Sequence, residues 1–421
     1  MQVIAKTLFF LLALGLIFTS LEGQSFLLQP SRVFDGQDMH EGWAVLVEGN
    51  RITAAGPLAS LSVPSEAEEI QLPGHTLMPG MIEGHSHLLL YPYNRADWND
   101  QVLKESNELR AIRGAVHAEK NLMAGFTTVR ELGSEGAGYA DVALKQAIEQ
   151  GIIPGPRLIV SGRAIVTTGS YGPKGFKPDF EVPLGAEAAD GEALIRVVRD
   201  QIGKGADFIK VYADYRWGPN GEAMPTFLQE ELEMIVKVAR SSGRGVVAHA
   251  ATAEGMRRAA LAGVETIEHG DGGTDEVFRL MKERGVALCP TLAAGDAILR
   301  YRGWDGNPET EPERIKQKRK SFKLALESGV TIVAGGDVGV FDHGENVREL
   351  ELMVEYGMKP LNVLRSVTAV NAEALHLMEL GRIRPGLLAD LIVVEGNPLE
   401  DISTLRKVKL VMKDGMVYKG P

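Results

Sequence analysis

The middle of the chain alternates short apolar runs with amphipathic runs, and this alternation restricts the possible folds more than any other feature. Eight apolar runs predict strands, at residues 81–88, 127–132, 157–161, 207–213, 245–250, 266–270, 287–292 and 332–337. Helical periodicity is clearest at residues 140–150, 192–203, 228–241 and 253–262. Eight β-then-α units in this order favour a closed parallel barrel over an open sheet.

The two ends of the chain have a different pattern from the middle. Residues 42–52 alternate in polarity around Gly49-Asn50, which predicts a hairpin. Short strands are also predicted near the C-terminus, at residues 390–394, 408–412 and 416–418. We therefore expect an α/β protein: a (β/α)₈ TIM barrel with a small β-sandwich built from both chain ends. The expected boundaries are 24–79 for the first β-sandwich part, 80–380 for the barrel and 381–421 for the second β-sandwich part.

The pattern of residues 1–23 is typical of a signal peptide. Lys6 precedes an apolar run over residues 7–18, which suits the apolar region of an export signal and is short for a bilayer span. A retained anchor or a misassigned start is the alternative. Cleavage would give a periplasmic or secreted protein without a membrane attachment. The formal net charge of −11 argues against nucleic acid or an anionic membrane as the main partner.

Side chains that bind metals stand at the ends of several predicted strands. The first strand ends in His85-Ser86-His87, and alternate strand residues point the same way. The fifth strand ends in His249, the sixth in His269 and the eighth in Asp337. Each residue taken alone is more often an ordinary surface, core or turn residue. Their joint placement at the face where barrel enzymes bind substrates predicts a metal site.

Lys210 lies inside the apolar fourth strand. Burial disfavours the ammonium form, and the free amine can add carbon dioxide to give a carbamate able to bridge two cations. The alternative is a lysine paired with a carboxylate at a strand end. The single cysteine, Cys289, excludes an intrachain disulfide and a multi-cysteine metal site, and it is expected to be a small core residue.

Four segments carry a resemblance to a known family. Residues 79–87, with the letters PGMIEGHSH, look like the first-strand signature of the amidohydrolase superfamily. Residues 125–133 are similar to its second-strand segment, 205–212 to its carboxylated-lysine strand, and 381–393 to its return into the β-sandwich. Within the superfamily the chain resembles the imidazolonepropionase-like and Xaa-Pro dipeptidase-like branch, of which residues 343–352 are typical. That branch hydrolyses dipeptides and N-acyl amino acids at the C-terminal amide.

The resemblance implies two divalent metal ions, with Zn²⁺ expected first and manganese or iron as alternatives. His85, His87 and Asp337 would hold the first metal. His249 and His269 would hold the second, and Lys210, N6-carboxylated, would bridge the two. A hydroxide shared by the metals would attack the amide carbonyl, while Asp337 moves a proton to the departing nitrogen.

Four further side chains are candidates for binding the substrate. Tyr212, expected also to act in catalysis, would donate a hydrogen bond to the substrate, unless it only packs at the barrel rim. Arg130 would bind a carboxylate, with an internal ion pair as the alternative. Tyr171 lies in the segment 167–173, where relatives often carry a histidine that this chain lacks. His343 would line the pocket or cap a loop.

Together these features predict a binuclear metal-dependent amidohydrolase that cleaves a carbon–nitrogen bond in a small molecule. The expected substrates are Xaa-Pro-like dipeptides or N-acyl amino acids. The alternatives are the same machinery acting on a cyclic amide, lactone or other ester, and a non-catalytic barrel scaffold. A mononuclear deaminase is disfavoured because it would not need Lys210. Assembly into a homo-oligomer stays open.

Overall fold

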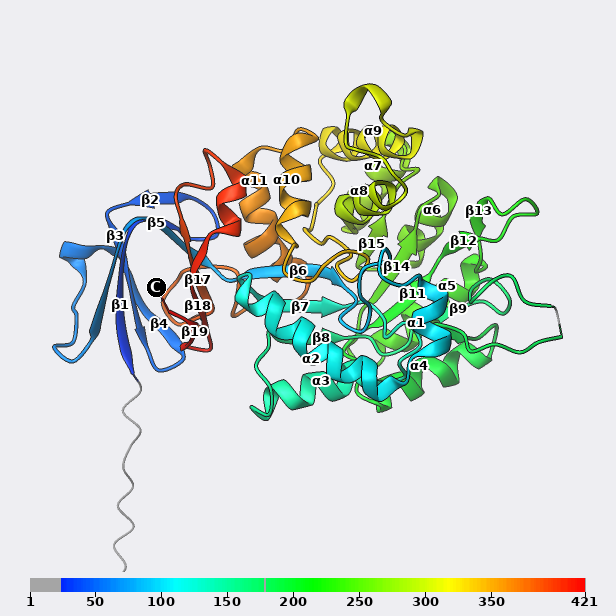
Figure 1. Cartoon of the computed structure of the whole chain (residues 1–421), viewed down its shortest axis with the longest axis horizontal. Coiled ribbons are helices and arrows are strands. Elements are labelled where there is room, and N and C mark those ends of the chain that lie inside the picture. Colours follow the sequence, from blue (N-terminus) through cyan, green and yellow to red (C-terminus); the bar gives the residue numbers. More distant parts are fainter. Residues whose placement is uncertain (1–23, 178, 421) are drawn as a thin grey trace, which may run out of the picture.

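The computed structural model describes residues 24–177 and 179–420, which form a β-rich unit and a larger α/β body (Figure 1). Segments from both ends of the chain, blue and red in Figure 1, make up the β-rich unit. The expected signal peptide, residues 1–23, lies outside the described residues. No helix in the described part of the chain is long and apolar enough to cross a membrane.

The β-rich unit is one sheet of eight strands in the order β19-β18-β17-β5-β1-β3-β4, with β2 paired to β1. The two chain ends meet where β17 runs antiparallel to β5, from Leu391 opposite Pro79 to Glu395 opposite His75. The strands are β1 (Ser25–Phe34), β2 (Met39–Glu41), β3 (Trp43–Glu48), β4 (Arg51–Pro57), β5 (Glu68–Pro79), β17 (Leu391–Glu395), β18 (Val408–Lys413) and β19 (Met416–Lys419).

The β-rich unit is one continuous sheet that curls on itself. Ile52 of β4 and Met412 of β18 come from opposite parts of the sheet, yet they share one apolar core. An isolated bridge between Arg51 and Leu388 further joins β4 to the segment that precedes β17. Curling brings the two halves of the sheet face to face around this shared apolar core.

The α/β body has a TIM-barrel-like arrangement of parallel strands surrounded by helices. One sheet has the order β6-β7-β8, and the other has the order β10-β9-β11-β14-β15-β16. The backbone amide of Asp207 donates to Val160 O at 2.8 Å, which links the start of β11 to the end of β8. The strands are β6 (Met81–Ser86), β7 (Phe126–Glu131), β8 (Arg157–Val160), β9 (Ile165–Val166), β10 (Glu187–Ala188), β11 (Ile209–Tyr212), β14 (Val246–Ala250), β15 (Thr266–His269) and β16 (Ala287–Cys289).

The helices begin and end close to the positions that periodicity predicts. Residues 253–262 form one helix, as expected, which begins where Thr252 accepts a hydrogen bond from Gly255 N and ends at Gly263, whose φ is +89°. The helices are α1 (Trp98–Lys104), α2 (Asn107–Met123), α3 (Ala140–Glu149), α4 (Ala193–Gly203), α5 (Gln229–Arg240), α6 (Ala253–Ala262), α7 (Asp275–Arg284), α8 (Leu292–Tyr301), α9 (Glu313–Ser328), α10 (Val347–Glu355), α11 (Pro360–Arg365) and α12 (Asn371–Ala374). A hairpin of β12 (Asp214–Arg216) and β13 (Ala223–Pro225) follows β11.

The expected eighth strand, residues 332–337, is not a regular strand. Ile332 bridges Leu288, and Val338 bridges Ser86, each as an isolated parallel pair. Two consecutive glycines precede Asp337, whose φ of +62° is incompatible with extended backbone. The segment still lies between β16 and β6, because Gly84 N donates to Ala334 O at 2.9 Å. It therefore occupies the place of a strand while its irregular backbone turns Asp337 toward the strand ends.

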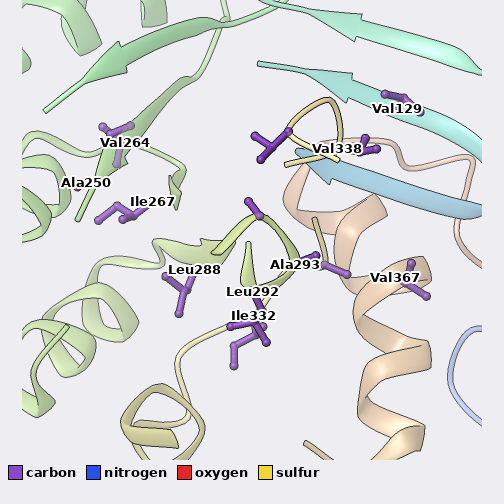
Figure 2. Close-up of a cluster of buried hydrophobic side chains, with 14 of the residues drawn as sticks. Val129, Ala250, Val264, Ile267, Leu288, Leu292, Ala293, Ile332, Val338 and Val367 are labelled. Atoms are coloured by element: carbon purple, nitrogen blue, oxygen red, sulfur yellow. The ribbon is translucent and has the colours of Figure 1, made fainter. Parts of the chain in front are cut away.

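Apolar side chains fill the space between the strands and the surrounding helices. Figure 2 shows part of this cluster, in which Ile267, Leu288 and Ile332 come from neighbouring strand positions and Val367 comes from a helical segment. Cys289 is a buried free thiol in β16, in agreement with its expected place in the core. The apolar layer fixes the strands against the helices, so that residues at the strand ends hold fixed positions.

Candidate active site

A cavity of about 530 Å³ opens at the carboxyl ends of the parallel strands. Its wall contains the four predicted histidine ligands and Asp337, together with the predicted substrate residues Tyr171 and Tyr212. Arg130 and His343 are not part of the wall. Residues from six different strand ends or following loops thus converge on one hollow, although they lie far apart in the sequence.

Asp337 faces the pair of imidazoles at the end of β6. Its Oδ1 atom lies 3.6 Å from His85 Nε2 and 3.4 Å from His87 Nε2. This oxygen is buried and has no hydrogen-bond partner among residues 24–177 and 179–420. His269 also belongs to this group, because one ligand atom each from His85, His269 and Asp337 lie within 4.8 Å of one another.

Three of the four imidazoles use Nδ1 for a supporting hydrogen bond, which leaves Nε2 free to bind a metal. A ring nitrogen that donates its proton to an oxygen also fixes the tautomer and the orientation of the ring. The supporting contacts are His85 Nδ1 to Glu268 Oε2 at 2.8 Å, His87 Nδ1 to Gly133 O at 2.9 Å, and His269 Nδ1 to Thr291 Oγ1 at 2.8 Å.

His249 differs from the other three imidazoles. Its Nε2 lies 3.7 Å from Asp214 Oδ1, which is within ion-pair range but too long for a hydrogen bond. Its ring packs 4.4 Å from the ring of His269 and stacks on Tyr212 at 4.5 Å between centroids. Asp214 is itself fixed, because it accepts hydrogen bonds from Ala251 N at 2.9 Å and from the hydroxyl of Thr252 at 2.7 Å.

Lys210 lies in β11 with a side chain that is 1% exposed. Its ammonium group has no ion pair within 4.0 Å in the described part of the chain, so the alternative of a strand-end lysine paired with a carboxylate is not what the structure shows. Burial lowers the pKa of Lys210. Burial, and then the neighbouring charge of Lys210, lower the pKa of His85 and lower that of His249 to about 3.

This donor set fits divalent cations. A buried carboxylate oxygen without a hydrogen-bond donor is costly, and Asp337 Oδ1 is such an atom. Neutral imidazole and carboxylate are ligands that zinc and similar metals bind, and burial keeps these imidazoles neutral. A cation beside Asp337 would satisfy its free oxygen and use the free nitrogens of His85 and His87.

The backbone of the cavity wall is strained. Six non-glycine residues in the described chain have a positive φ, and four of them line the cavity: Glu135 at +46°, His269 at +77°, Thr291 at +49° and Asp337 at +62°. Such conformations cost free energy and persist where the surrounding structure enforces them, typically at functional sites. The strain therefore marks the same hollow as the imidazoles do.

Arg130 does not have the role expected for it in substrate binding. Its guanidinium is 2% exposed and lies outside the cavity wall, where it donates to Glu268 Oε1 at 3.0 Å and to Gly84 O at 2.7 Å. Glu268 in turn supports His85. The alternative of an internal ion pair is the correct one, with Glu268 as the partner.

His343 caps a loop instead of lining the cavity. Its Nε2 donates to Leu90 O at 3.1 Å, its Nδ1 lies 3.0 Å from Asn121 Nδ2, and its ring stacks on His117 at 4.1 Å. Both imidazoles hold the turn that follows His87, because His117 Nδ1 contacts Leu88 O at 2.8 Å. His343 is excluded from the wall because its ring is fully enclosed by this packing.

Glu135 is a cavity residue that the sequence analysis missed. Its Oε2 accepts hydrogen bonds from Trp98 Nε1 and the Tyr171 hydroxyl, both at 2.8 Å, and its Oε1 accepts one from the Tyr212 hydroxyl at 3.3 Å. The phenol proton of Tyr212 therefore points to Glu135 and not to a substrate oxygen, unlike the expected arrangement. A polar residue just after the second strand was the available signal.

The outer wall of the cavity carries cationic side chains. Arg216 and Arg302 are exposed and line the cavity, and neither has an ion pair within residues 24–177 and 179–420. Arg314 and Lys318 differ, because both lie near Asp271, at 3.7 Å and 2.5 Å. Arg216 and Arg302 are therefore the cavity arginines that are available to a substrate anion.

Comparisons with known proteins agree with this geometry. The sequence profile of the amidohydrolase family matches residues 76–417. An ochratoxinase from Aspergillus niger is 32% identical over 381 residues, which cover 82% of this chain and 76% of the relative. An imidazolonepropionase from Cutibacterium acnes is 23% identical over 361 residues, 83% of each chain.

A solved structure of a Xaa-Pro dipeptidase with bound methionine in the active site superposes with a TM-score of 0.84 at 33% identity, covering 94% of this chain and all of the other. The resemblance to the imidazolonepropionase-like and Xaa-Pro dipeptidase-like branch is thus confirmed. The fold of these relatives also supports a TIM-barrel-like body with a β-rich unit.

Proposed function

This chain belongs to the amidohydrolase family, and from that premise we propose that it hydrolyses the carbon–nitrogen bond that precedes a C-terminal amino acid. The substrates would be dipeptides of the Xaa-Pro type or N-acyl amino acids. The observation that carries the proposal is Oδ1 of Asp337, which is buried beside two imidazoles of the cavity wall and has no hydrogen-bond partner in the described part of the chain. The similarity to a Xaa-Pro dipeptidase supports the choice of substrate.

We propose that His85, His87 and Asp337 would hold one divalent cation, that His249 and His269 would hold a second, and that Lys210, once carboxylated, would be a ligand of both. When bound, such cations would lower the pKa of a water toward neutrality and polarise the scissile carbonyl, and Zn²⁺ suits these ligands. Lys210 supports this assignment because it is buried beside both groups of imidazoles without an ion pair among the described residues.

Asp337 is the proposed proton carrier. With Oδ1 given to a cation beside His85 and His87, its second carboxylate oxygen would take a proton from the attacking water. The same carboxylate would then give the proton to the departing nitrogen, because an amide anion leaves very poorly. Burial raises the pKa of Asp337, which makes its carboxylate a better proton acceptor near neutral pH.

The C-terminal carboxylate of the substrate needs a cationic partner, and Arg130 is not available to it. We assign this contact to Arg216 or Arg302, which line the cavity and are exposed at its outer wall. A guanidinium can bind a carboxylate through two parallel hydrogen bonds.

Export of the enzyme to the periplasm or medium, directed by residues 1–23, is also part of the proposal.

The test combines metal analysis with a substrate panel. The purified protein should contain about two divalent ions per chain, and it should hydrolyse Xaa-Pro dipeptides or N-acyl amino acids but not lactones. Removing the metal with a chelator should abolish the activity, and re-addition of Zn²⁺ should restore it. Activity on lactones or cyclic amides alone would contradict the proposed substrate class.

The Lys210→Ala variant should bind less metal because it lacks one of the proposed ligands. Its kcat/KM should fall by about a hundredfold or more. Lys413→Ala is a matched control. Lys413 is also a buried lysine, but it lies in β18 of the β-rich unit and donates to Gly155 O at 2.9 Å, outside the cavity. Equal metal content in the two variants would remove Lys210 from the metal site.

A further inference from the structure

One part of the cavity wall combines a buried carboxylate with a group of aromatic rings. Glu135 is 3% exposed and lines the cavity, and it has no ion pair within 4.0 Å in the part of the chain that the structure describes. Its hydrogen-bond partners are three neutral donors, on Trp98, Tyr171 and Tyr212. The wall at this point thus holds a negative charge that no neighbouring side chain pairs with.

The rings around Glu135 pack closely on one another. Tyr171 lies 4.8 Å from both Tyr212 and Tyr215, and 5.3 Å from Trp98, measured between ring centroids. All four rings line the cavity. Aromatic faces carry partial negative charge, and a group of several aromatic rings is a recurring way to bind ammonium groups. We call Glu135 with these four rings the aromatic subsite.

The direction of the hydrogen bonds decides which ligand this subsite accepts. The hydroxyls of Tyr171 and Tyr212 give their single protons to Glu135, so each oxygen can only accept a further hydrogen bond. The carboxylate of Glu135 is also an acceptor only. The indole N–H of Trp98 is already used by Glu135, and the remaining polar atoms of the subsite are all hydrogen-bond acceptors. The subsite therefore favours a ligand group that donates hydrogen bonds, and it would repel a substrate carboxylate or carbonyl.

The position of the subsite relates it to the reacting bond. Tyr212 stacks on His249 at 4.5 Å, and the Gly133 carbonyl, two residues before Glu135, accepts from His87. The subsite is therefore adjacent to the imidazoles. In a dipeptide the free amino group is attached one carbon away from the scissile carbonyl, so it must lie close to them as well.

We propose that the aromatic subsite binds the free α-ammonium group of the substrate, so that the enzyme prefers dipeptides with a free amino end to N-acyl amino acids. This inference rests on the proposed hydrolysis of a C-terminal amino-acid amide. Glu135 supplies the charge and one acceptor, and the phenol oxygens of Tyr171 and Tyr212 supply two further acceptors. Arg110 holds the backbone of Glu135 from behind, through a bond to its carbonyl at 2.8 Å.

The experiment compares two substrates that differ only in the ammonium group. Ala-Pro and propionyl-Pro have the same carbon skeleton, and only Ala-Pro carries the free amino group. We expect kcat/KM for Ala-Pro to be about tenfold to a hundredfold higher, as a charge-assisted hydrogen bond predicts. Equal values for the two would overturn the inference and leave the proposed function intact, whereas hydrolysis of neither would contradict the proposed function.

A second pair identifies the source of the ammonium group. N-acetyl-Lys-Pro and N-acetyl-norleucyl-Pro differ only in a side-chain ammonium. We expect no preference between these two, and a preference found only here would assign the subsite to a basic side chain and overturn the α-ammonium assignment. Both comparisons use the unaltered enzyme, so neither depends on the folding of a variant.

Glu135→Gln preserves size and removes the charge. It should bring the ratio of kcat/KM for Ala-Pro over propionyl-Pro close to one. Glu105→Gln is the matched control, since Glu105 lies in the same part of the chain, outside the cavity, and is bound to Arg113 at 2.6 Å. The control should retain the full ratio, and an unchanged ratio in Glu135→Gln would overturn the inference.

Discussion

The β-rich unit and the cavity end of the barrel bury side chains of opposite kinds. The core of the β-rich unit is made of apolar side chains such as Phe26, Leu391 and Leu410, which come from strands at both ends of the chain. The cavity end buries four imidazoles, a lysine and several carboxylates. The apolar core of the β-rich unit stabilises the folded state. The cavity end destabilises it, because buried polar groups and strained backbone cost free energy.

The same contrast is seen in the backbone. Asp414 in the β-rich unit has a positive φ, but it stands with Gly415 in the tight turn between β18 and β19, where that conformation is required. Glu135, Thr291 and Asp337 at the cavity have positive φ values in positions where no tight hairpin requires them. The strained backbone in the β-rich unit forms a tight turn, whereas the strained backbone at the cavity orients residues of the cavity wall.

The largest expected effect is a loss of activity without a loss of stability at the cavity. Asp337→Asn keeps the size of the side chain and removes its proton acceptor, so kcat/KM should fall by about 10²–10⁴-fold. The melting temperature of chelator-treated protein should stay the same or rise, because a buried, unpartnered charge is removed. Steady-state kinetics and calorimetry measure the two quantities.

Asp342→Asn is the control for this variant. Asp342 follows in the same segment but is 41% exposed, forms an ion pair with Arg95 at 2.8 Å and does not line the cavity. It should have almost unchanged kinetics. Full activity in Asp337→Asn would show that the buried polar groups are structural, and the contrast between the two regions would then disappear.

The next effect is the reverse, a loss of stability without a loss of activity. Leu391→Ala removes a fully buried side chain of β17, and the free energy of unfolding should fall by about 2–5 kcal/mol. Below the melting temperature, kcat/KM per folded molecule should be unchanged, because Leu391 lies outside the cavity wall. A large fall in kcat/KM would mean that the β-rich unit also shapes the active site.

The smallest expected effect concerns a polar exception in the β-rich unit. Asp390 is 5% exposed, and burial raises its pKa to about 6. A raised carboxylate pKa means that the folded state binds the proton more tightly, so ionised Asp390 destabilises the fold at pH 7. Asp390→Asn should be about 1–3 kcal/mol more stable than wild type at pH 7.

That advantage should decrease as the pH falls through 6 and should vanish near pH 4, where Asp390 becomes protonated in the unfolded state as well as in the folded state. Urea denaturation at several pH values measures it. A stability difference that grows toward low pH would have the wrong sign and would mean that Asp390 stabilises the fold through its contact with Arg157, at 3.7 Å.

The sequence predicted the parts of the site that depend on strand ends. His85, His249 and His269 end apolar strands, and parallel strands bring their carboxyl ends to one face, so their convergence follows from periodicity and topology. The resemblance to the family then narrowed the candidate metal ligands further than spacing alone.

Features that depend on side-chain partners were not predictable in this way. Whether Arg130 faces a substrate or Glu268 is decided by a neighbour 138 positions away in the sequence, which periodicity does not locate. Glu135 was missed for the same reason, because its aromatic partners come from α1, from the segment after β9 and from β11. The prediction of a regular eighth strand was wrong because Gly335, Gly336 and the positive φ of Asp337 give this segment an irregular backbone. The hydrophobic pattern of the sequence does not reveal this irregularity.

The pairing of β5 with β17 has a consequence for biosynthesis. Pro79 emerges from the ribosome long before its partner Leu391, so one edge of β5 has no neighbour while the whole barrel is being made. An open edge of this kind can recruit strands from other chains. The nascent chain therefore exposes an unpaired strand edge until β17 has been synthesised. A chain truncated before residue 391 should aggregate rather than fold.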